Sequence, residues 1–306
     1  MKTLNITHID FVGKRKFALI FSAILLVISI ASFSLQGLKL GIDFTGGTLI
    51  EVSSKTTSNL EEIRTSLKDN GFKSFNVSHF GSDREVLIYL QPQEVSSAKL
   101  SSKILNILGE KYTMRRVEFV GPKVGEELTN DGGLAMLYAL IGILIYVALR
   151  FEYRFGIGSV AALIHDVIIT LGVFSITGMQ FDLTVLAAIL AVIGYSLNDT
   201  VVVFDRIREN FLSSRKDDSD LIVNDSLNQT LSRTIMTSLT TLLVLTALFI
   251  FGGEIISGFA IALIIGVAIG TYSSIYVASS VILAMGVKKA DLLPSEKDQQ
   301  EIDFRP

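Results

Sequence analysis

Cysteine is absent from the 306-residue chain, and histidine occurs only three times. The absence of cysteine excludes disulfide bonds, thiol nucleophiles and cysteine-based metal sites, and the few histidines argue against a histidine-rich metal site. The formal net charge of −3 gives no sign of nucleic-acid binding. Because the sequence also contains no catalytic triad or nucleotide-binding motif, we expect neither an enzyme nor a bound cofactor.

Apolar residues, in contrast, are plentiful and are grouped in blocks. The mean hydropathy of +0.52 is too high for an ordinary soluble domain of this length. A membrane-spanning helix needs about 20 mostly apolar residues. The six apolar blocks cover approximately residues 17–35, 134–149, 157–176, 183–204, 235–251 and 259–285. The sequence therefore predicts a polytopic α-helical membrane protein with six transmembrane helices.

Lysine and arginine lie in alternate connections between these blocks. The N-terminal segment carries Lys14, Arg15 and Lys16, and basic residues recur in the second-to-third and fourth-to-fifth connections and after the last block. The two remaining short connections carry none. Because basic residues are enriched in cytoplasmic loops, both termini are predicted to be cytoplasmic. The first block does not end in a small-residue cleavage site and is interpreted as a retained anchor.

The long connection over residues 37–132 would then lie outside the cytoplasm, and its pattern is that of a folded domain. The predicted elements are strands at 48–52, 74–79, 86–90 and 112–120 and helices at 60–67 and 98–108. Asn59 is a plausible N-cap for the first helix. The order β-α-β-β-α-β is the ferredoxin-like arrangement, so we expect an external α+β domain.

These patterns divide the chain into four parts. The predicted parts are a first helix within 1–36, the external domain at 37–132, five further helices at 133–286 and a cytoplasmic tail at 287–306. A polar cytoplasmic loop is expected at about 205–232. The first part of this loop has the pattern of an amphipathic helix that continues the fourth span.

A carboxylate interrupts the fourth apolar block. Asp199 lies there with Tyr195, Ser196 and Asn198, and the apolar run then resumes. An ionised aspartate inside hydrocarbon costs about 2.5 to 3.5 kcal/mol, and nothing nearby in the sequence offsets that cost. Asp199 must therefore find a partner on another helix, face water or stay protonated. Asn198 is expected to hold Asp199 through a hydrogen bond.

Polar residues also open the fifth block. Arg233 lies at a depth similar to that of Asp199, because the fourth and fifth spans run in opposite directions. The hydroxyl residues that follow it, including Thr237 and Ser238, form a polar helical face that is expected to point into the bundle.

The third block is interrupted by His165 and Asp166. Adjacent positions on a helix face about 100° apart, so the two side chains are not expected to meet the same partner. Asp166 is a second intramembrane carboxylate, and it is either a relay group or a packing partner. His165 is interpreted as a histidine satisfied within the bundle rather than as a proton shuttle.

Glycines open the external domain. Gly41, Gly46 and Gly47 surround Asp43, and the segment lacks the Gly-Lys-Ser/Thr ending of a nucleotide-binding loop. We expect a turn that feeds the first strand, with Asp43 as a capping or docking residue.

Two other sets of small or restricted residues have predicted structural roles. Gly121 and Pro122 form a junction that leads back toward the membrane and suits a hinge. Ala262, Gly266 and Gly270 recur at four-residue spacing in the sixth block, which permits close helix packing within the chain or against a partner.

Three stretches carry a family resemblance. They are GIDFTGG at 41–47, VGPKVGEEL at 120–128 and YSLNDTVVVFDRIREN at 195–210. In combination they resemble the SecF family, the smaller membrane subunits of the bacterial SecD–SecF complex that assists the protein-export translocase. That family belongs to the RND superfamily, whose twelve-span transporters consist of two six-span halves. The resemblance covers nearly the whole chain.

The resemblance implies a function and a set of partners. SecD would supply the other half, and the complex would use the proton-motive force to assist export of a preprotein across the bacterial inner membrane. Protons would be the coupling ion, with Asp199 as the proton carrier and Arg233 as the residue that answers it. The SecY-E-G channel is a further implied partner, with YajC and YidC as additional candidates.

Each of these assignments has an alternative. In the alternative to proton transfer, Asp199 is a structural residue that is hydrogen-bonded across helices and never titrates. Arg233 in that case extends to the lipid headgroups. The whole chain is then a non-transporting scaffold that stabilises the translocon. A small-molecule efflux half-pump is a third possibility, but one ferredoxin-like unit is small for a drug-binding chamber.

Overall fold

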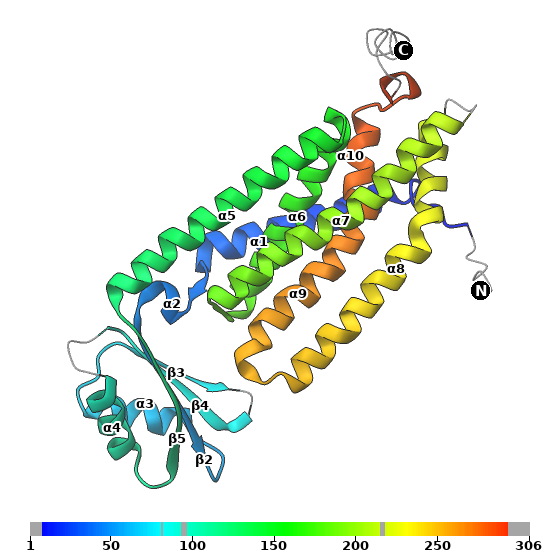
Figure 1. Cartoon of the computed structure of the whole chain (residues 1–306). Coiled ribbons are helices and arrows are strands. Elements are labelled where there is room, and N and C mark those ends of the chain that lie inside the picture. The colour runs from blue at the N-terminus through cyan, green and yellow to red at the C-terminus, as the bar shows by residue number, and fades with distance from the viewer. Residues whose placement is uncertain (1–7, 81, 93–96, 215–217, 293–306) are drawn as a thin grey trace.

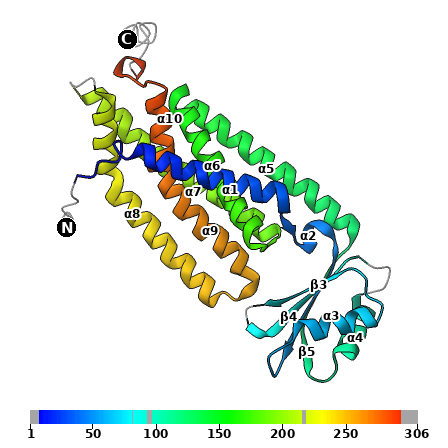
Figure 2. The same ribbon diagram turned by 180° about the vertical axis from the view of Figure 1, so that it is seen from behind.

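A bundle of long helices carries a small sheet domain at one end (Figures 1 and 2). The computed structural model describes residues 8–80, 82–92, 97–214 and 218–292. Both ends of this described chain lie at the end of the bundle that is farthest from the sheet domain (Figure 1).

Six helices among the described residues are long and apolar enough to cross a membrane. They are α1 (Arg15–Gln36), α5 (Pro122–Arg150), α6 (Tyr153–Thr177), α7 (Leu183–Ser213), α8 (Ser219–Phe251) and a last span made of α9 (Glu254–Ser273), the π-helical turn η1 (Ser274–Ala278) and α10 (Ser279–Ala284). Helices suit this setting because they satisfy every backbone polar group internally where no water is present. The predicted six-helix architecture is confirmed.

Several helices extend beyond the apolar blocks that predicted them. The helix α5 begins at Pro122, so the domain boundary that we expected after residue 132 lies inside a continuous helix. Most of the stretch at 205–232, expected to be a polar loop, belongs to α7 and α8. Hydropathy detects only the part of a helix that is apolar, whereas local hydrogen bonding and capping set its ends. Asp182 and Asp218 cap α7 and α8 through the backbone N–H groups of the first turns.

The sheet domain contains four strands and two helices. In chain order these are β2 (Gly47–Ser54), α3 (Leu60–Asp69), β3 (Phe75–Phe80), β4 (Ser82–Leu90), α4 (Ser97–Leu108) and β5 (Tyr112–Val120). The strands pair in the order β3-β4-β2-β5, and every pair is antiparallel. The predicted ferredoxin-like arrangement is therefore confirmed. Gly81, between β3 and β4, lies outside the described residues.

Alternation along the strands places the core of this domain between the sheet and its two helices. Ile50 and Val52 of β2 are buried, as are Ile63 and Leu67 of α3, and they belong to one apolar cluster. The Asn59 side chain accepts a hydrogen bond from the backbone N–H of Glu61, so it caps α3 as predicted.

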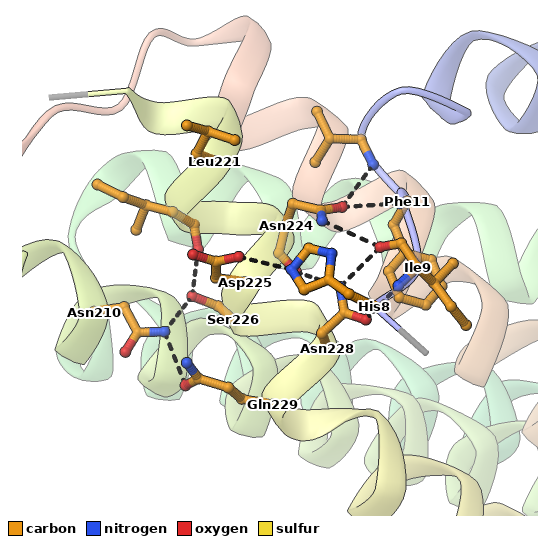
Figure 3. Close-up of polar contacts among 12 residues, drawn as sticks. His8, Ile9, Phe11, Asn210, Leu221, Asn224, Asp225, Ser226, Asn228 and Gln229 are labelled. Atoms are coloured by element: carbon orange, nitrogen blue, oxygen red, sulfur yellow. Dashed lines mark hydrogen bonds and ion pairs between the residues drawn. The ribbon is translucent and has the colours of Figure 1, made fainter. Parts of the chain in front are cut away.

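A short N-terminal segment docks on α8 (Figure 3), at the end of the bundle far from the sheet domain (Figure 1). The Asn224 side chain accepts hydrogen bonds from the backbone N–H groups of Phe11 and Val12, at 2.8 and 3.2 Å. The side chain of Asn228, one turn along the helix, accepts from the N–H of Ile9 at 2.8 Å and donates to its carbonyl at 2.8 Å. Two amide side chains on one helical face thus supply hydrogen bonds to this irregular backbone, which lies outside any helix or strand.

Ion pairs also gather at this end of the bundle. They are Arg15–Asp220, Arg150–Asp205, Arg154–Asp291 and Arg208–Glu152. These pairs connect α1 with α8, α5 with α7, α6 with the 3₁₀ turn η2 (Lys289–Leu292), and α7 with the residue that precedes α6.

Candidate functional site

Asp199 lies inside the bundle, where its side chain is 6% exposed. One carboxylate oxygen accepts a hydrogen bond from the Thr234 hydroxyl of α8 at 3.0 Å, and the other accepts from the Ser274 hydroxyl of η1 at 2.6 Å. Two other elements, α8 and η1, therefore donate hydrogen bonds to this carboxylate of α7. The sequence left three options for Asp199, namely a partner on another helix, contact with water or a retained proton. The structure shows partners on other helices.

Arg233 does not meet Asp199 in the structure. No ion pair or hydrogen bond joins these two described residues, and the Arg233 side chain is exposed on the outer side of α8. The physical reason is rotation about the helix axis: neighbouring residues face about 100° apart, and Thr234 is the one that faces inward. The expectation that Arg233 pairs with Asp199 within this chain was wrong.

The polar residues that were expected to support Asp199 also differ in whether they face outward or into the bundle. Asn198 is exposed and, among the described residues, has no hydrogen bond to Asp199, so the predicted support is not formed. Thr237 is exposed and donates its hydroxyl to carbonyls of its own helix. Ser238 is buried and contacts Tyr195 at 3.2 Å and Thr271 at 2.6 Å, which ties α8 to α7 and α9.

Asp166 occupies a second buried polar cluster, with its side chain 1% exposed. Its Oδ2 atom accepts hydrogen bonds from Ser196 of α7 at 2.5 Å and from Ser273 of α9 at 2.7 Å. Its Oδ1 atom lies 2.9 Å from Nδ1 of His165, and Nε2 of that histidine lies 3.1 Å from the Ser22 hydroxyl of α1. His165 and Asp166 do have different partners on other helices, but they also contact each other.

The two clusters are built on the same pair of elements. Ser196 and Asp199 lie one turn apart on α7, and the consecutive residues Ser273 and Ser274 donate to Asp166 and Asp199 respectively. The junction between α9 and the π-helical turn η1 falls between these two serines. Single π-helical turns within α-helices occur frequently at functional sites.

Close packing of α7 and α9 makes this arrangement possible. A Cβ atom added at Gly266 would lie 2.1 Å from a Val192 methyl group, and one at Gly270 would lie 3.1 Å from Cβ of Ser196. Ala262 is fully buried in the same span. The small-residue stripe thus serves packing within the chain, one of the two uses expected for it.

The glycine motif connects the sheet domain to the bundle. Asp43, in the short helix α2 (Ile42–Thr45), accepts a hydrogen bond from the backbone N–H of Leu183 at 3.0 Å, and so docks on the first residue of α7. Beside it, β1 (Lys39–Leu40) pairs in parallel with β6 (Gln180–Phe181). Gly41, which precedes α2, donates its N–H to the carbonyl of Phe181.

The second motif packs directly on the first. Gly46 and Gly47 have φ values of 65° and 131°, which glycine adopts far more readily than other residues. A Cβ atom at Gly46 would lie 3.0 Å from Cα of Pro122, so the backbones are almost in contact. Gly121 precedes α5 with extended backbone, and Pro122 takes its first position, where no N–H donor is needed.

The chemistry available here is that of protonatable side chains. Within the described residues, no group of three or more histidine, aspartate or glutamate side chains is placed to hold a metal ion. Both buried carboxylates are instead answered by hydroxyl groups. Ser22 of this network was missed from the sequence, because a hydroxyl in an apolar block gives no signal of its own.

Comparison with known families covers most of the chain. Residues 100–288 match the family described as protein export membrane protein SecD/SecF, C-terminal. Residues 31–58, which include the glycine motif, match the SecD/SecF GG motif.

Proteins of the same kind match over nearly their whole length. A protein translocase subunit SecF from Vibrio alginolyticus is 52% identical over 301 residues, which cover 97% of this chain and 96% of that protein. The SecF subunit from Escherichia coli O157:H7 is 42% identical over 300 residues, with 96% and 93% covered.

Solved structures extend the likeness to the fold. SecDF from Thermus thermophilus, described as a translocon-associated membrane protein, superposes with a TM-score of 0.86 at 38% identity, covering 93% of this chain and 39% of that one. A super-membrane-facing form of SecDF gives a TM-score of 0.70 at 36% identity, covering 100% and 41%. The chain thus spans about two fifths of the solved SecDF chains. Its six apolar helices, its sheet domain and these matches together show that it belongs to the SecD/SecF family of protein export membrane proteins.

Proposed function

We propose that this chain is a subunit of the bacterial Sec protein translocase that works with SecD and uses the proton-motive force to promote late preprotein translocation across the inner membrane. Relatives named as translocase subunits, matched along nearly their full length, support the Sec role. The SecDF structures, of which this chain covers two fifths, support SecD as the other half.

The observation that carries the proton-coupling part is the set of partners around Asp199. A carboxylate that must gain and lose a proton needs neighbours that satisfy both forms. Hydroxyl groups can do this, because they both donate and accept and can rotate. Ser274 has a second acceptor, the carbonyl of Thr271 at 3.0 Å. When Asp199 is protonated, Ser274 can turn its hydrogen to that carbonyl and accept the carboxyl proton.

Arg233, on the outer surface of this chain's bundle, also has a role in the proposal. A guanidinium group at the depth of a membrane requires an answering group, and none of the described ion pairs involves Arg233. Asn198 is exposed as well, near the same depth on α7. We assign this side of α7 and α8 to the contact with SecD, where Arg233 would act on the proton-carrying carboxylates from the interface. Asp166 is the second carboxylate of the same path.

The orientation and the other partners belong to the same proposal. The basic connections support cytoplasmic termini, and the proposed orientation then has the sheet domain on the other side, where the preprotein emerges. Movement of this domain with that of SecD would draw or hold the preprotein. The SecY-E-G channel is the proposed site of action, and YajC and YidC are further candidate partners.

The decisive test is an export assay in inside-out vesicles that carry this chain with SecD. Early ATP-driven translocation is completed first, and the proton gradient is then applied to wild type and to the Asp199→Asn variant. We expect the gradient to stimulate completion in wild type and to have no effect in the variant. Asp205→Asn is the matched control, because this aspartate lies on the same helix but is half-exposed and paired with Arg150.

A scaffold that only stabilises the translocon predicts a different result. In that case wild type and Asp199→Asn respond alike to the gradient, or the variant loses activity only because less of the protein accumulates. Quantifying this chain and SecD by immunoblot in every vesicle preparation separates the two functions.

A further inference from the structure

A chain of hydrogen-bond contacts leads from α1 and α9 to Asp166. The Tyr272 hydroxyl donates to the carbonyl of Ala18 at 2.6 Å. The Ser22 hydroxyl lies 3.1 Å from the Tyr272 oxygen and 3.1 Å from Nε2 of His165. Nδ1 of His165 lies 2.9 Å from Oδ1 of Asp166. Four consecutive contacts thus run from a backbone carbonyl to a buried carboxylate.

Each contact in this chain needs one hydrogen atom between its two heavy atoms. A carbonyl oxygen only accepts, so the Tyr272 hydrogen is used on Ala18. The Ser22 hydrogen then fills the contact with Tyr272, which leaves Nε2 of His165 as the donor to Ser22. A neutral histidine has only one N–H. The fourth contact, between Nδ1 and Asp166, is therefore filled only by one additional proton.

The other side of Asp166 supports the same count. Its Oδ2 atom already accepts hydrogens from Ser196 and Ser273, so the additional proton belongs on the side of Oδ1 and Nδ1. His165 and Asp166 are 3% and 1% exposed. A neutral histidine beside an ionised aspartate would leave a net charge in this apolar interior, which is costly. With the additional proton the pair is electrically neutral, whichever of the two atoms holds it.

We infer that His165 and Asp166 form a second proton-binding site, in which one proton is shared between Nδ1 and Oδ1. The titratable side chains placed near this pair are Tyr272, whose ring stacks on His165 with centroids 6.2 Å apart, and Asp199, which is reached through Ser273 and Ser274. The protonation of the pair stands on geometry alone. Its use in driving export rests on the proposed function.

Nitrogen NMR of the full-length chain in lipid bilayers tests the inference directly. Replacing His8 and His79 by glutamine leaves His165 as the only histidine, so its two ring nitrogens can be assigned after histidine-selective ¹⁵N labelling. At neutral pH we expect either an imidazolium, which holds the additional proton on Nδ1, or the neutral ring protonated on Nε2 together with a protonated Asp166 carboxyl group. A neutral ring protonated on Nδ1, with bare Nε2, would overturn the inference.

Infrared spectroscopy then locates the proton within the pair. A carbonyl band of a protonated carboxyl group that is present in wild type and absent from Asp166→Asn places the proton on Asp166. If the band is absent from both, an imidazolium places the proton on the histidine, whereas a neutral ring overturns the inference. Asp166→Asn itself imitates the protonated carboxyl, since its NH₂ group can donate to Nδ1 while its oxygen accepts from both serines. The variant is therefore expected to keep the Nε2-protonated ring and the thermal stability of wild type, whereas Asp166→Leu is expected to lose stability.

These measurements fail independently of the proposed function. If the His165 ring is protonated on Nδ1 but Asp199→Asn loses the gradient response as expected, only the inference of a second proton-binding site is wrong. If the expected ring signals are found but Asp199→Asn keeps a full gradient response, only the proposed proton coupling through Asp199 is wrong.

Discussion

Carboxylates differ in burial and in hydrogen-bond partners between the middle of the bundle and its end far from the sheet domain. In the middle, Asp166 and Asp199 are almost fully buried and receive hydrogen bonds mainly from serine and threonine hydroxyls. At the far end, half-exposed carboxylates face arginines, as in the 2.6 Å contacts between Arg150 and Asp205.

The difference follows from what each partner permits. An arginine is always protonated, so it favours only the ionised form of a carboxylate and holds two helices together. A hydroxyl can answer either form, at the cost of providing no opposite charge. The far end is therefore suited to fixing the helix ends, and the middle is suited to exchanging protons.

The largest expected effect comes from removing the hydroxyls around Asp199. In the double variant Thr234→Val with Ser274→Ala, both side-chain donors to the carboxylate are lost. A hydrogen bond to a charged group contributes about 1.5 to 3 kcal/mol, so the ionised form of Asp199 becomes much less favourable. We expect the gradient response in the vesicle assay to fall to that of Asp199→Asn.

Ser280→Ala provides the matched control for this prediction. Ser280 is also buried in the last span, but its hydroxyl has no hydrogen-bond partner among the described residues. Its removal is expected to leave the gradient response unchanged. A full gradient response in the double variant would show that the hydroxyls are not required, and the contrast between the two regions would lose its functional meaning.

A smaller effect is expected from separating the helices that bring the hydroxyls together. Gly266→Ala places a methyl group against Val192 of α7, and such overpacking typically costs about 1 to 3 kcal/mol. We expect a lower midpoint of thermal unfolding in detergent micelles. In Gly142→Ala, where no neighbouring atom lies within 4 Å of the added methyl group, the midpoint should stay the same or rise. Equal effects of the two substitutions would contradict close packing of α7 on α9.

The smallest effect concerns a carboxylate of the far end. Burial raises the pKa of Glu152 above its ordinary value of 4.5, and this outweighs the opposing attraction of Arg208 and Arg154. An acid with a raised pKa in the folded state destabilises that state when ionised, so stability should increase as the pH falls through the raised pKa toward 4.5.

Glu152→Gln removes this ionisation. The variant is expected to have a slightly higher unfolding midpoint than wild type at neutral pH, and the difference should shrink on acidification. Unfolding curves of both proteins over this pH range measure it. If the variant is less stable at neutral pH, the ion pair with Arg208 contributes more than burial costs, and Glu152 acts like the other members of the far end.

The fold was predictable because its signals are local. Apolar blocks indicate the six helices, and alternation indicates the strands of the sheet domain. The need of Asp199 for partners on other helices, for water or for a proton was predictable too, since it is a charge in an apolar block. Its donors Thr234 and Ser274 lie 35 and 75 residues away in the sequence, and pairing over such distances depends on how the helices are rotated and set against each other.

The incorrect prediction for Arg233 shows where the sequence stops being informative. Counting residues gives the depth of a side chain in the membrane but not the direction in which it points. Arg233 has the right depth to meet Asp199, yet its neighbour Thr234 faces the carboxylate. The prediction for Asn198 is wrong for the same reason. Asn198 precedes Asp199 on α7, so its side chain points in another direction.

The hydrogen bond between Asp43 and the first backbone N–H of α7 has a mechanical consequence. The helix α7 continues without interruption from Leu183 to Ser213, and Asp199 lies about 24 Å from its first residue at 1.5 Å per residue. A helix resists stretching, so a pull on Asp43 along the axis displaces Asp199 by nearly the same amount. The hydroxyl contacts of Asp199 are 2.6 and 3.0 Å long, and a shift of less than one residue along the axis is enough to change them. Force applied to the sheet domain thus reaches the buried carboxylate through a single rigid element.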